Sequence, residues 1–185
     1  MSNNQHFAIQ PVATRDALPQ PVANQMLEHV RLRASAMRVL VCGGTPELVS
    51  ALIAKRAIVD VIERAPNLRT AFEALGCSLV GNDLLDVEPS QLYDFVVLFA
   101  PADIEVAYTR HAFAFLKPGA TLVTVLAEDL PRRTDLVSQA FVGWRHSLGA
   151  LIVDLPPNAF PASVRPRSGL TILEAPPAKR GGGTW

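Results

Sequence analysis

The segment YDFVVLFAPADIEVAYTRHAFAFLKPGATLVTVLAED, residues 93–129, decides the fold. Its apolar run at 93–99 predicts a buried strand, and a second run at 120–126 predicts another. Between them we expect a helix that begins after Asp103 as N-cap, continues to about Leu116 and is ended by the Lys-Pro-Gly turn. A strand, a helix and a second strand in this order are the repeating unit of a parallel sheet.

The loop after the first of these strands is Phe99-Ala100-Pro101-Ala102. In open α/β sheets, ligands bind beyond the carboxyl ends of the strands, so such a loop is where chemistry is expected. None of these four side chains can donate or accept a proton. The layout therefore predicts an enzyme-like fold with no reactive group in this loop.

Further strands and helices alternate on both sides of this unit. Strands are predicted at 37–42, 58–63, 77–81, 150–155 and 169–175, and helices at Pro21–Arg33, 45–56 (Thr45 as N-cap and Pro46 at the first helical position), 65–76 (ended by Gly76) and 132–149. The strands are continuous apolar runs, which is typical of a parallel sheet covered on both faces. The last two strands have no helix between them, which favours an antiparallel addition at one edge. We expect an α/β, doubly wound, Rossmann-like sheet.

Length and composition indicate one soluble domain of 185 residues. We expect an N-terminal arm at 1–19, a folded domain at 20–175 and a flexible tail at 176–185. Neither a secretory signal nor a membrane-length apolar run is visible, and two cysteines within apolar segments suit a reducing compartment, so we expect a cytoplasmic protein.

The number and balance of charged residues limit the kinds of partner that we expect. Charged residues make up only 18% of the chain and the net charge is zero, so nothing demands a nucleic-acid partner. The low charge fraction suggests a buried partner surface in a homo-oligomer or with another protein. The short basic segments at 165–167 and 178–180 either contact nucleic acid or are simply solvated.

Three positions that follow predicted strands are candidate ligand contacts. Gly43-Gly44 lies at a strand-to-helix turn, where backbone N–H groups can approach a ligand, although a plain tight turn also explains it. Glu63 ends the next predicted strand, about 20 residues after the glycine turn, which is the spacing of an acid that binds ribose hydroxyls. The alternative is a solvated glutamate. Asp83 either accepts a hydrogen bond from an adenine amine or caps a turn.

No metal site is expected, because the four histidines are scattered and have no carboxylate or cysteine at ligand spacing.

From about Leu18 to Ala175 these motifs, in this order, resemble a class I S-adenosylmethionine-dependent methyltransferase. They are VLVCGGTP, the strand-ending Glu63 in VDVIERAPNL, GNDLLD, FAPA, AFLKPGATLV and FVGWRHSLGALIVDLPPNAF. More narrowly, they resemble small bacterial, phage and plasmid N6-adenine DNA methyltransferase-like proteins. The resemblance implies a seven-stranded sheet whose final strand is antiparallel and inserted beside the fifth. It also implies S-adenosylmethionine as the cofactor, bound near Gly43, Gly44, Glu63, Asp83 and Phe99.

The catalytic loop departs from that family. The family has asparagine or aspartate where this chain has Phe99, and an aromatic residue that stacks on a flipped base where it has Ala102. Only Pro101 matches. In the cofactor turn, Val41 replaces the usual acid and Pro46 replaces a glycine. We therefore expect no catalytic residue for adenine methylation.

Three functional hypotheses follow. The first is a methyltransferase-fold protein that has lost adenine methylation and acts as a binding, regulatory or assembly component. The second is an active methyltransferase on another acceptor, DNA or a small molecule, since methyl transfer depends mainly on proximity and alignment. The third is a nicotinamide-binding Rossmann protein, which the incomplete glycine fingerprint disfavours.

Overall fold

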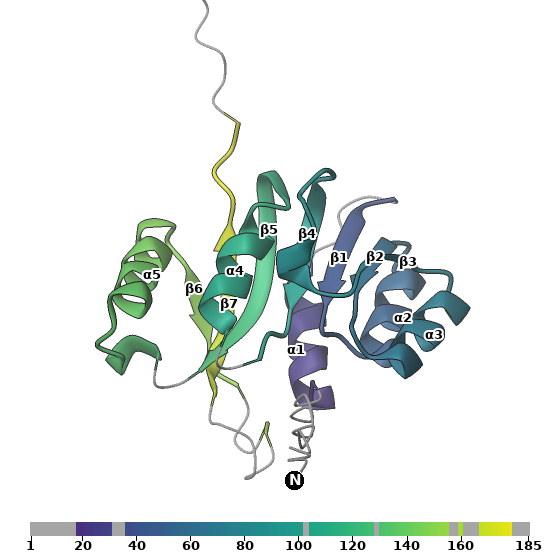
Figure 1. The fold of residues 1–185 in the computed structure, drawn as a ribbon, viewed down its shortest axis with the longest axis horizontal. Coiled ribbons are helices and arrows are strands. Elements are labelled where there is room, and N and C mark those ends of the chain that lie inside the picture. Colours follow the sequence, from purple (N-terminus) through teal and green to yellow (C-terminus); the bar gives the residue numbers. More distant parts are fainter. Residues whose placement is uncertain are drawn as a thin grey trace, which may run out of the picture.

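A computed structural model describes residues 18–30, 36–101, 104–127, 130–155, 159–160 and 167–178. One seven-stranded sheet has the order β3-β2-β1-β4-β5-β7-β6 (Figure 1). The strands are β1 (Arg38–Cys42), β2 (Ile58–Ile62), β3 (Ser78–Gly81), β4 (Tyr93–Leu98), β5 (Leu116–Ala127), β6 (Leu151–Val153) and β7 (Arg167–Glu174). The helices are α1 (Gln20–His29), α2 (Pro46–Ala54), α3 (Pro66–Ala74), α4 (Glu105–Phe113) and α5 (Leu136–Ser147), with short 3-10 turns η1 (Leu84–Asp86) and η2 (Leu130–Arg132).

The pairing of the strands confirms the expected topology. β1, β2, β3, β4 and β5 run parallel, whereas β7 pairs antiparallel with both β5 and β6. The last strand in sequence thus lies beside the fifth, inside the sheet. The sheet is doubly wound with one reversed strand, as the sequence predicted.

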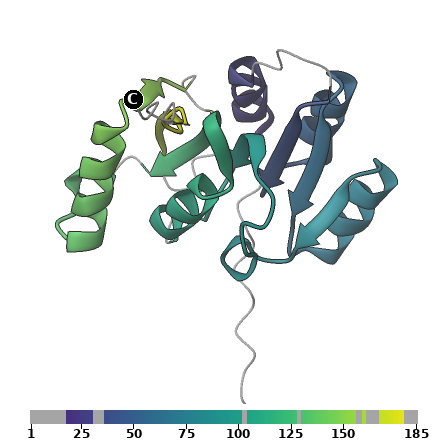
Figure 2. The ribbon, with the colours of Figure 1, turned by 90° about the horizontal axis from the view of Figure 1, so that it is seen from above.

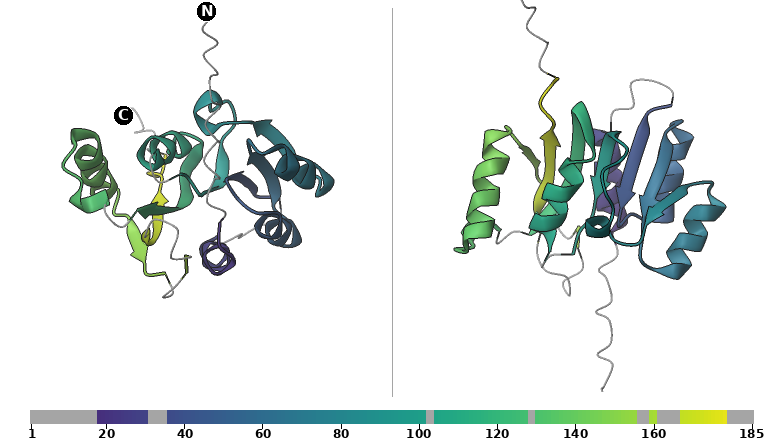
Figure 3. Two further views of the ribbon diagram at one scale, coloured as in Figure 1. Left: turned by 60° about the horizontal axis from the view of Figure 1, so that its bottom comes forward. Right: turned by 45° about the horizontal axis from the view of Figure 1, so that its top comes forward.

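Helices cover both faces of the sheet, and the alternation of side chains explains why. Val39 and Val41 of β1 pack in one cluster with residues of α1, α2 and α3, whereas Leu40 and Cys42 pack with α4 on the other face. Figure 2 shows α1 and α4 on opposite sides of the strands. Figure 3 shows α5 at the end of the sheet formed by β7 and β6. Both faces are apolar because both are buried.

The connection between β3 and β4 contains only the turn η1, so part of one sheet face has no covering helix. Asp60 pairs with Ser78, which places Ile58 and Val80 on that same face. Ile58 is 45% exposed and Val80 is 39% exposed. The low charge fraction of the sequence predicted a surface that binds a partner. That surface stays a prediction, and the exposed side chains of Ile58 and Val80 are candidates for it.

Several helix ends agree with the sequence. Thr45 caps α2 by accepting a hydrogen bond from the Leu48 amide at 3.3 Å, and Pro46 occupies the first turn. Gly76 follows α3 with a φ of 81°, a left-handed conformation that favours glycine. Cys42 and Cys77 are both buried free thiols, as the sequence predicted.

Three predicted helices are clearly longer than the observed ones. The helix predicted at 132–149 is observed at Leu136–Ser147, where Asp135 caps it by accepting a hydrogen bond from the Ser138 amide at 2.8 Å. Helix α1 ends at His29 instead of Arg33, because the backbone of Val30 leaves the helical region and its side chain enters the core. Helix α4 begins at Glu105 and ends at Phe113, and the expected cap Asp103 lies outside the described residues. Leu116 is not helical because it pairs with Tyr93 at the start of β5.

A buried carboxylate joins the first strands near their amino ends. Asp60 is 2% exposed, and its Oδ2 accepts hydrogen bonds from Arg38 at 3.2 Å, Gln91 at 3.1 Å and the Tyr93 hydroxyl at 3.0 Å. These donors come from β1, β4 and the segment before β4. Burial, followed by the adjacent Asp60 charge, raises the pKa of Tyr93 above its ordinary value. Asp60 therefore fixes how three segments meet.

We expect Asp60→Ala to destabilise the fold by about 2–3 kcal/mol, because it leaves the buried Tyr93 hydroxyl without its acceptor. The measurement is urea unfolding, with the exposed Asp86→Ala as control. Equal unfolding midpoints for wild type and Asp60→Ala would show that the network does not hold these strands.

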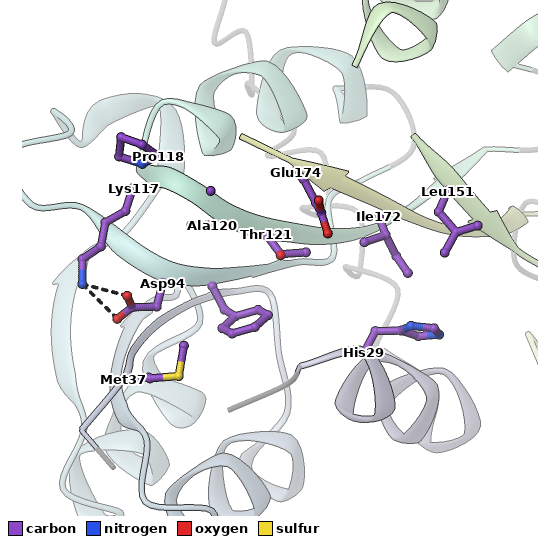
Figure 4. A pocket seen from close by; sticks show the side chains of 12 residues that line it. His29, Met37, Asp94, Lys117, Pro118, Ala120, Thr121, Leu151, Ile172 and Glu174 are labelled. Atoms are coloured by element: carbon purple, nitrogen blue, oxygen red, sulfur yellow. Dashed lines mark hydrogen bonds and ion pairs between the residues drawn. The ribbon is translucent and has the colours of Figure 1, made fainter. Parts of the chain in front are cut away.

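A second ion pair lies at the amino ends of β4 and β5. Lys117 Nζ is 2.9 Å from both carboxylate oxygens of Asp94, and the Arg38 amide donates to Asp94 Oδ2 at 2.8 Å (Figure 4). Partial burial works to raise the pKa of Asp94, but the hydrogen bonds from Lys117 and from the Arg38 amide hold it below its ordinary value. The folded chain therefore favours the ionised carboxylate.

A lowered pKa in the folded state gives a stability contribution that is present above the unfolded pKa of about 3.9 and is lost as pH falls through the folded value. Asp94→Asn should therefore lower the free energy of unfolding at pH 7, by about 1 kcal/mol given the half-exposed lysine. The difference from wild type should shrink as the pH falls below about 4. Urea unfolding at pH 7 and at acid pH measures this, and a pH-independent difference would contradict it.

Candidate functional site

The carboxyl ends of neighbouring strands bring three of the five predicted site residues into one row. Cys42 pairs with Ile62 and with Leu98, so the residues that follow, Gly43, Glu63 and Phe99, lie side by side at one edge of the sheet. The Phe99 amide donates to the Cys42 carbonyl at 2.9 Å, and the Glu63 amide donates to the Gly81 carbonyl at 3.2 Å. Asp83 follows β3 at the same edge.

The turn at Gly43-Gly44 needs both glycines for reasons within the fold. Gly43 has a φ of 77°, which disfavours other residues. A Cβ on Gly44 would lie 2.5 Å from Cγ1 of Val41. The turn leads directly into α2, whose first residue is Pro46. A tight turn thus accounts for both glycines, and their contact with a cofactor stays a prediction.

Glu63 is a buried carboxylate, which excludes the alternative of a solvated strand-end glutamate. It is 1% exposed, and its Oε1 accepts the backbone N–H groups of Arg64 and Ala65, each at 2.8 Å. These bonds fix the carboxylate at the start of α3, which begins at Pro66. A preformed acceptor is thereby held beside the Gly43 turn.

Asp83 is both a cap and the centre of a small polar cluster. Its Oδ1 accepts from the Leu85 amide at 3.0 Å and from the Tyr108 hydroxyl at 2.7 Å, while Oδ2 pairs with Arg64. Partial burial works to raise the pKa of Asp83, but the hydrogen bonds from Tyr108, Leu85 and Arg64 hold it below its ordinary value. Asp83 is therefore an anion at neutral pH, with donors on both oxygens.

Three further residues belong to this edge although no sequence motif pointed to them: Arg64, Arg69 and Tyr108. Arg69 Nη1 donates to the carbonyls of Glu63 at 3.1 Å and Gly81 at 3.2 Å, and so ties the ends of β2 and β3 together. Tyr108 reaches Asp83 from α4, about 25 residues away in sequence. The one available signal was the position of Arg64 directly after Glu63.

Phe99 is buried against the protein's own chain. It is 3% exposed, and its ring stacks on Phe160 with a centroid separation of 6.3 Å and an interplanar angle of 10°. Phe160 follows β6 and is distant in sequence. An aromatic pair therefore lies at the position of the catalytic loop, while Ala102, the other departure from the resembling family, lies outside the described residues.

A cavity lies at another edge of the sheet, and neither a metal site nor a membrane-spanning helix was found in the described part of the chain. A cavity of about 530 Å³ is lined by Asp94, Lys117, Thr121, Glu174 and His29 among others (Figure 4), so it opens at the amino ends of β4 and β5. Among the described residues, no group of three His, Cys, Asp or Glu side chains is arranged to hold a metal. No helix within the described ranges is both long and apolar enough to cross a bilayer.

No protein-family model and no curated protein sequence matches the chain significantly. Solved structures do match it. A putative class I S-adenosylmethionine-dependent methyltransferase from Listeria monocytogenes has a TM-score of 0.64 at 14% identity, covering 88% of this chain and 61% of that one. N-methyltransferase NodS from Bradyrhizobium japonicum WM9, in complex with S-adenosyl-L-homocysteine, has a TM-score of 0.58 at 14% identity, covering 83% and 85%. The 23S rRNA methyltransferase ErmE has a TM-score of 0.61 at 18% identity, covering 84% and 68%.

At these identities the likeness concerns the fold. The matches extend over 83% to 88% of this chain. The chain has the fold of the class I S-adenosylmethionine-dependent methyltransferases.

Proposed function

We propose that the chain is an S-adenosylmethionine-dependent methyltransferase whose acceptor is not an adenine amine. The observation that carries the proposal is the buried Glu63 carboxylate, held beside the Gly43 turn in a sheet with a methyltransferase strand order. The reversed β7 between β5 and β6 argues against the nicotinamide-binding alternative. Structural neighbours include one with a bound S-adenosyl-L-homocysteine, which supports the choice of cofactor.

The residues at this edge fit an adenosyl group in part. Ribose hydroxyls can donate to Glu63, whose carboxylate is already oriented by two backbone N–H groups. Backbone N–H groups at the Gly43-Gly44 turn can approach the methionine portion. Asp83 is the proposed acceptor for the adenine amine, and Arg64, whose side chain is 67% exposed, is the donor that can move aside for it.

Methyl transfer at this site would depend on alignment. When bound, the cofactor supplies an electrophilic methyl group, and an acceptor with an available lone pair needs chiefly to be held in line with it. Neither ring of the Phe99–Phe160 pair offers a strong hydrogen-bond acceptor, and Phe99 itself is buried. This favours an acceptor that needs no help in losing a proton over the delocalised amine of adenine.

A second candidate function is a binding or regulatory component without methyl transfer, and the same aromatic pair is the observation that favours it. Phe160 stacks on Phe99 from within the chain and so occupies space beside the loop where an acceptor would approach. In that case the adenosyl group would bind but no acceptor would enter. Both candidate functions predict that the cofactor binds, and only the first predicts that a methyl group is transferred.

Calorimetric titration with S-adenosyl-L-homocysteine tests the cofactor site. We expect binding by wild type and a loss of about 1–3 kcal/mol in Glu63→Ala, because ribose hydroxyls then lack their acceptor. Glu73→Ala, an exposed glutamate on α3, is the matched control. Binding unaffected by Glu63→Ala would remove Glu63 from the site, and no binding by wild type would reject the proposal.

A tritiated-methyl transfer assay on unmethylated DNA tests the acceptor. We expect no adenine N6-methylation by wild type, because Phe99 cannot accept a hydrogen bond from the amine. Losing one hydrogen-bonding group that is positioned to stabilise the transition state can lower the rate roughly a hundredfold or more.

The matched comparison is the double variant Phe99→Asn with Ala102→Phe. Activity in that variant alone would show that the loop is what excludes adenine, and silence in both would point to the Gly43-Gly44 turn as a second cause. Robust adenine methylation by wild type would overturn this part of the proposal.

A further inference from the structure

The cavity of about 530 Å³ at the amino ends of β4 and β5 lies opposite to the edge that holds Glu63. The strand register shows how its floor is built. Phe95 pairs with Thr121, and Thr121 pairs with Glu174, so these side chains form one row across β4, β5 and β7 on the same face of the sheet. All three line the cavity. A carboxylate and a hydroxyl thus lie beside an aromatic ring.

Helix α1 covers this face of the sheet only in part, which leaves the cavity open. Val97 and Val123, in the next row along β4 and β5, are buried in a cluster with residues of α1. Ile172 lies in the same row as Val123 but lines the cavity, and its β6 partner Leu151 is 57% exposed. Helix α1 ends at His29, which is also part of the lining (Figure 4). The cavity therefore has an apolar side, formed by Ile172 and Leu151, toward the open edge of the sheet.

With His29 neutral, the ionisable side chains of the lining leave one negative charge uncompensated. Lys117 Nζ is 2.9 Å from both carboxylate oxygens of Asp94, so these two charges neutralise each other. Glu174 is exposed, and no cation among the described residues lies within ion-pair distance of its carboxylate. The carboxyl end of α1, at His29, adds a partial negative charge. The cavity is therefore suited to a cation.

We propose that the cavity binds a small molecule that carries a primary ammonium group on an apolar body. An ammonium group has three N–H donors. The Glu174 carboxylate and the Thr121 hydroxyl are neighbouring acceptors for them, because directly paired antiparallel residues have Cβ atoms about 4.5–5.5 Å apart. The apolar body contacts Phe95 and Ile172. The cavity volume lies within the range of about 300–1,000 Å³ that is usual for small-molecule sites.

The positions of the charges in Figure 4 agree with this class of ligand. Glu174 and Thr121 lie between the Lys117–Asp94 pair on one side and Ile172 on the other. An anion would meet the unpaired Glu174 carboxylate, while the lysine that could attract it is already bound to Asp94. An uncharged ligand would remove water from Glu174 without supplying a counter-ion, which is unfavourable.

This site is separate from the proposed cofactor site, because the two lie at opposite ends of the parallel strands. The inference therefore rests neither on cofactor binding nor on methyl transfer.

The test is thermal unfolding with 2-phenylethylammonium chloride at constant ionic strength and at pH 8, where an alkyl amine is protonated. We expect the amine to raise the Tm of wild type saturably, as mass action requires for a ligand of the folded state. Sodium 3-phenylpropanoate and 2-phenylethanol carry the same apolar body with a carboxylate or a hydroxyl, and they should give smaller shifts at equal concentration. Methylammonium chloride, which has the charge without the apolar body, should also give a smaller shift.

Two variants assign the shift to this cavity. Glu174→Gln should raise the half-saturating amine concentration about tenfold, because a hydrogen bond to an ionised acceptor becomes a neutral one. Its Tm without ligand should stay near that of wild type, since Glu174 is exposed. Thr121→Val, which keeps the shape of the side chain, should raise that concentration about threefold. The matched control is Glu28→Gln, an exposed glutamate next to His29 that does not line the cavity, and it should behave like wild type.

Several outcomes would overturn the proposal. One is a wild-type Tm that the amine does not raise saturably, and another is an unchanged half-saturating concentration in Glu174→Gln. A larger shift with 3-phenylpropanoate than with the amine would contradict it too, and would assign the cavity to an anion beside Lys117. Equal shifts with 2-phenylethanol and with the amine would show that the charge is not recognised.

Discussion

The parallel pairing of β1 with β2 on one side and β4 on the other is the constraint on which the candidate site depends. Because Cys42 is level with both Ile62 and Leu98, the three residues that follow these strands meet in one row. The register is specified by packing, since a slip by one residue would exchange Val39 and Val41, which pack against α1 and α2, with Leu40 and Cys42, which pack with α4. Core packing thus positions the polar edge.

Buried carboxylates have a consistent structural pattern here, in which each is held by donors from its surroundings. Asp60 accepts from three side chains near the amino ends of the strands. Glu105 accepts from the Ala127 amide at 2.7 Å and pairs with Arg133 at 3.0 Å. Glu63 accepts from two backbone N–H groups at the edge of the proposed cofactor site.

The aromatic pair in the loop after β4 connects the fold to the question of activity. In this fold the loop after β4 lies beside the Gly43 turn, so whatever occupies it determines what can approach a cofactor there. Phe99 is stacked on Phe160 and buried in the cluster that also holds α1. The loop therefore contributes to the core as well as to the edge of the site, and a change in it affects packing and chemistry together.

The sequence by itself determined the strand and helix order and placed Gly43, Glu63, Asp83 and Phe99 at or just after the ends of their strands, because apolar periodicity and turn residues are local signals. The reversed strand beside the fifth was implied by the family resemblance. It could not show the ends of α1 and α4, which depend on where Val30 and Glu105 are buried. Only the tertiary structure brought Tyr108 and Arg64 to Asp83 and Phe160 to Phe99. Those contacts join residues that are far apart in the chain, or side chains whose direction no sequence pattern specifies, and they form only when the helices pack on the sheet.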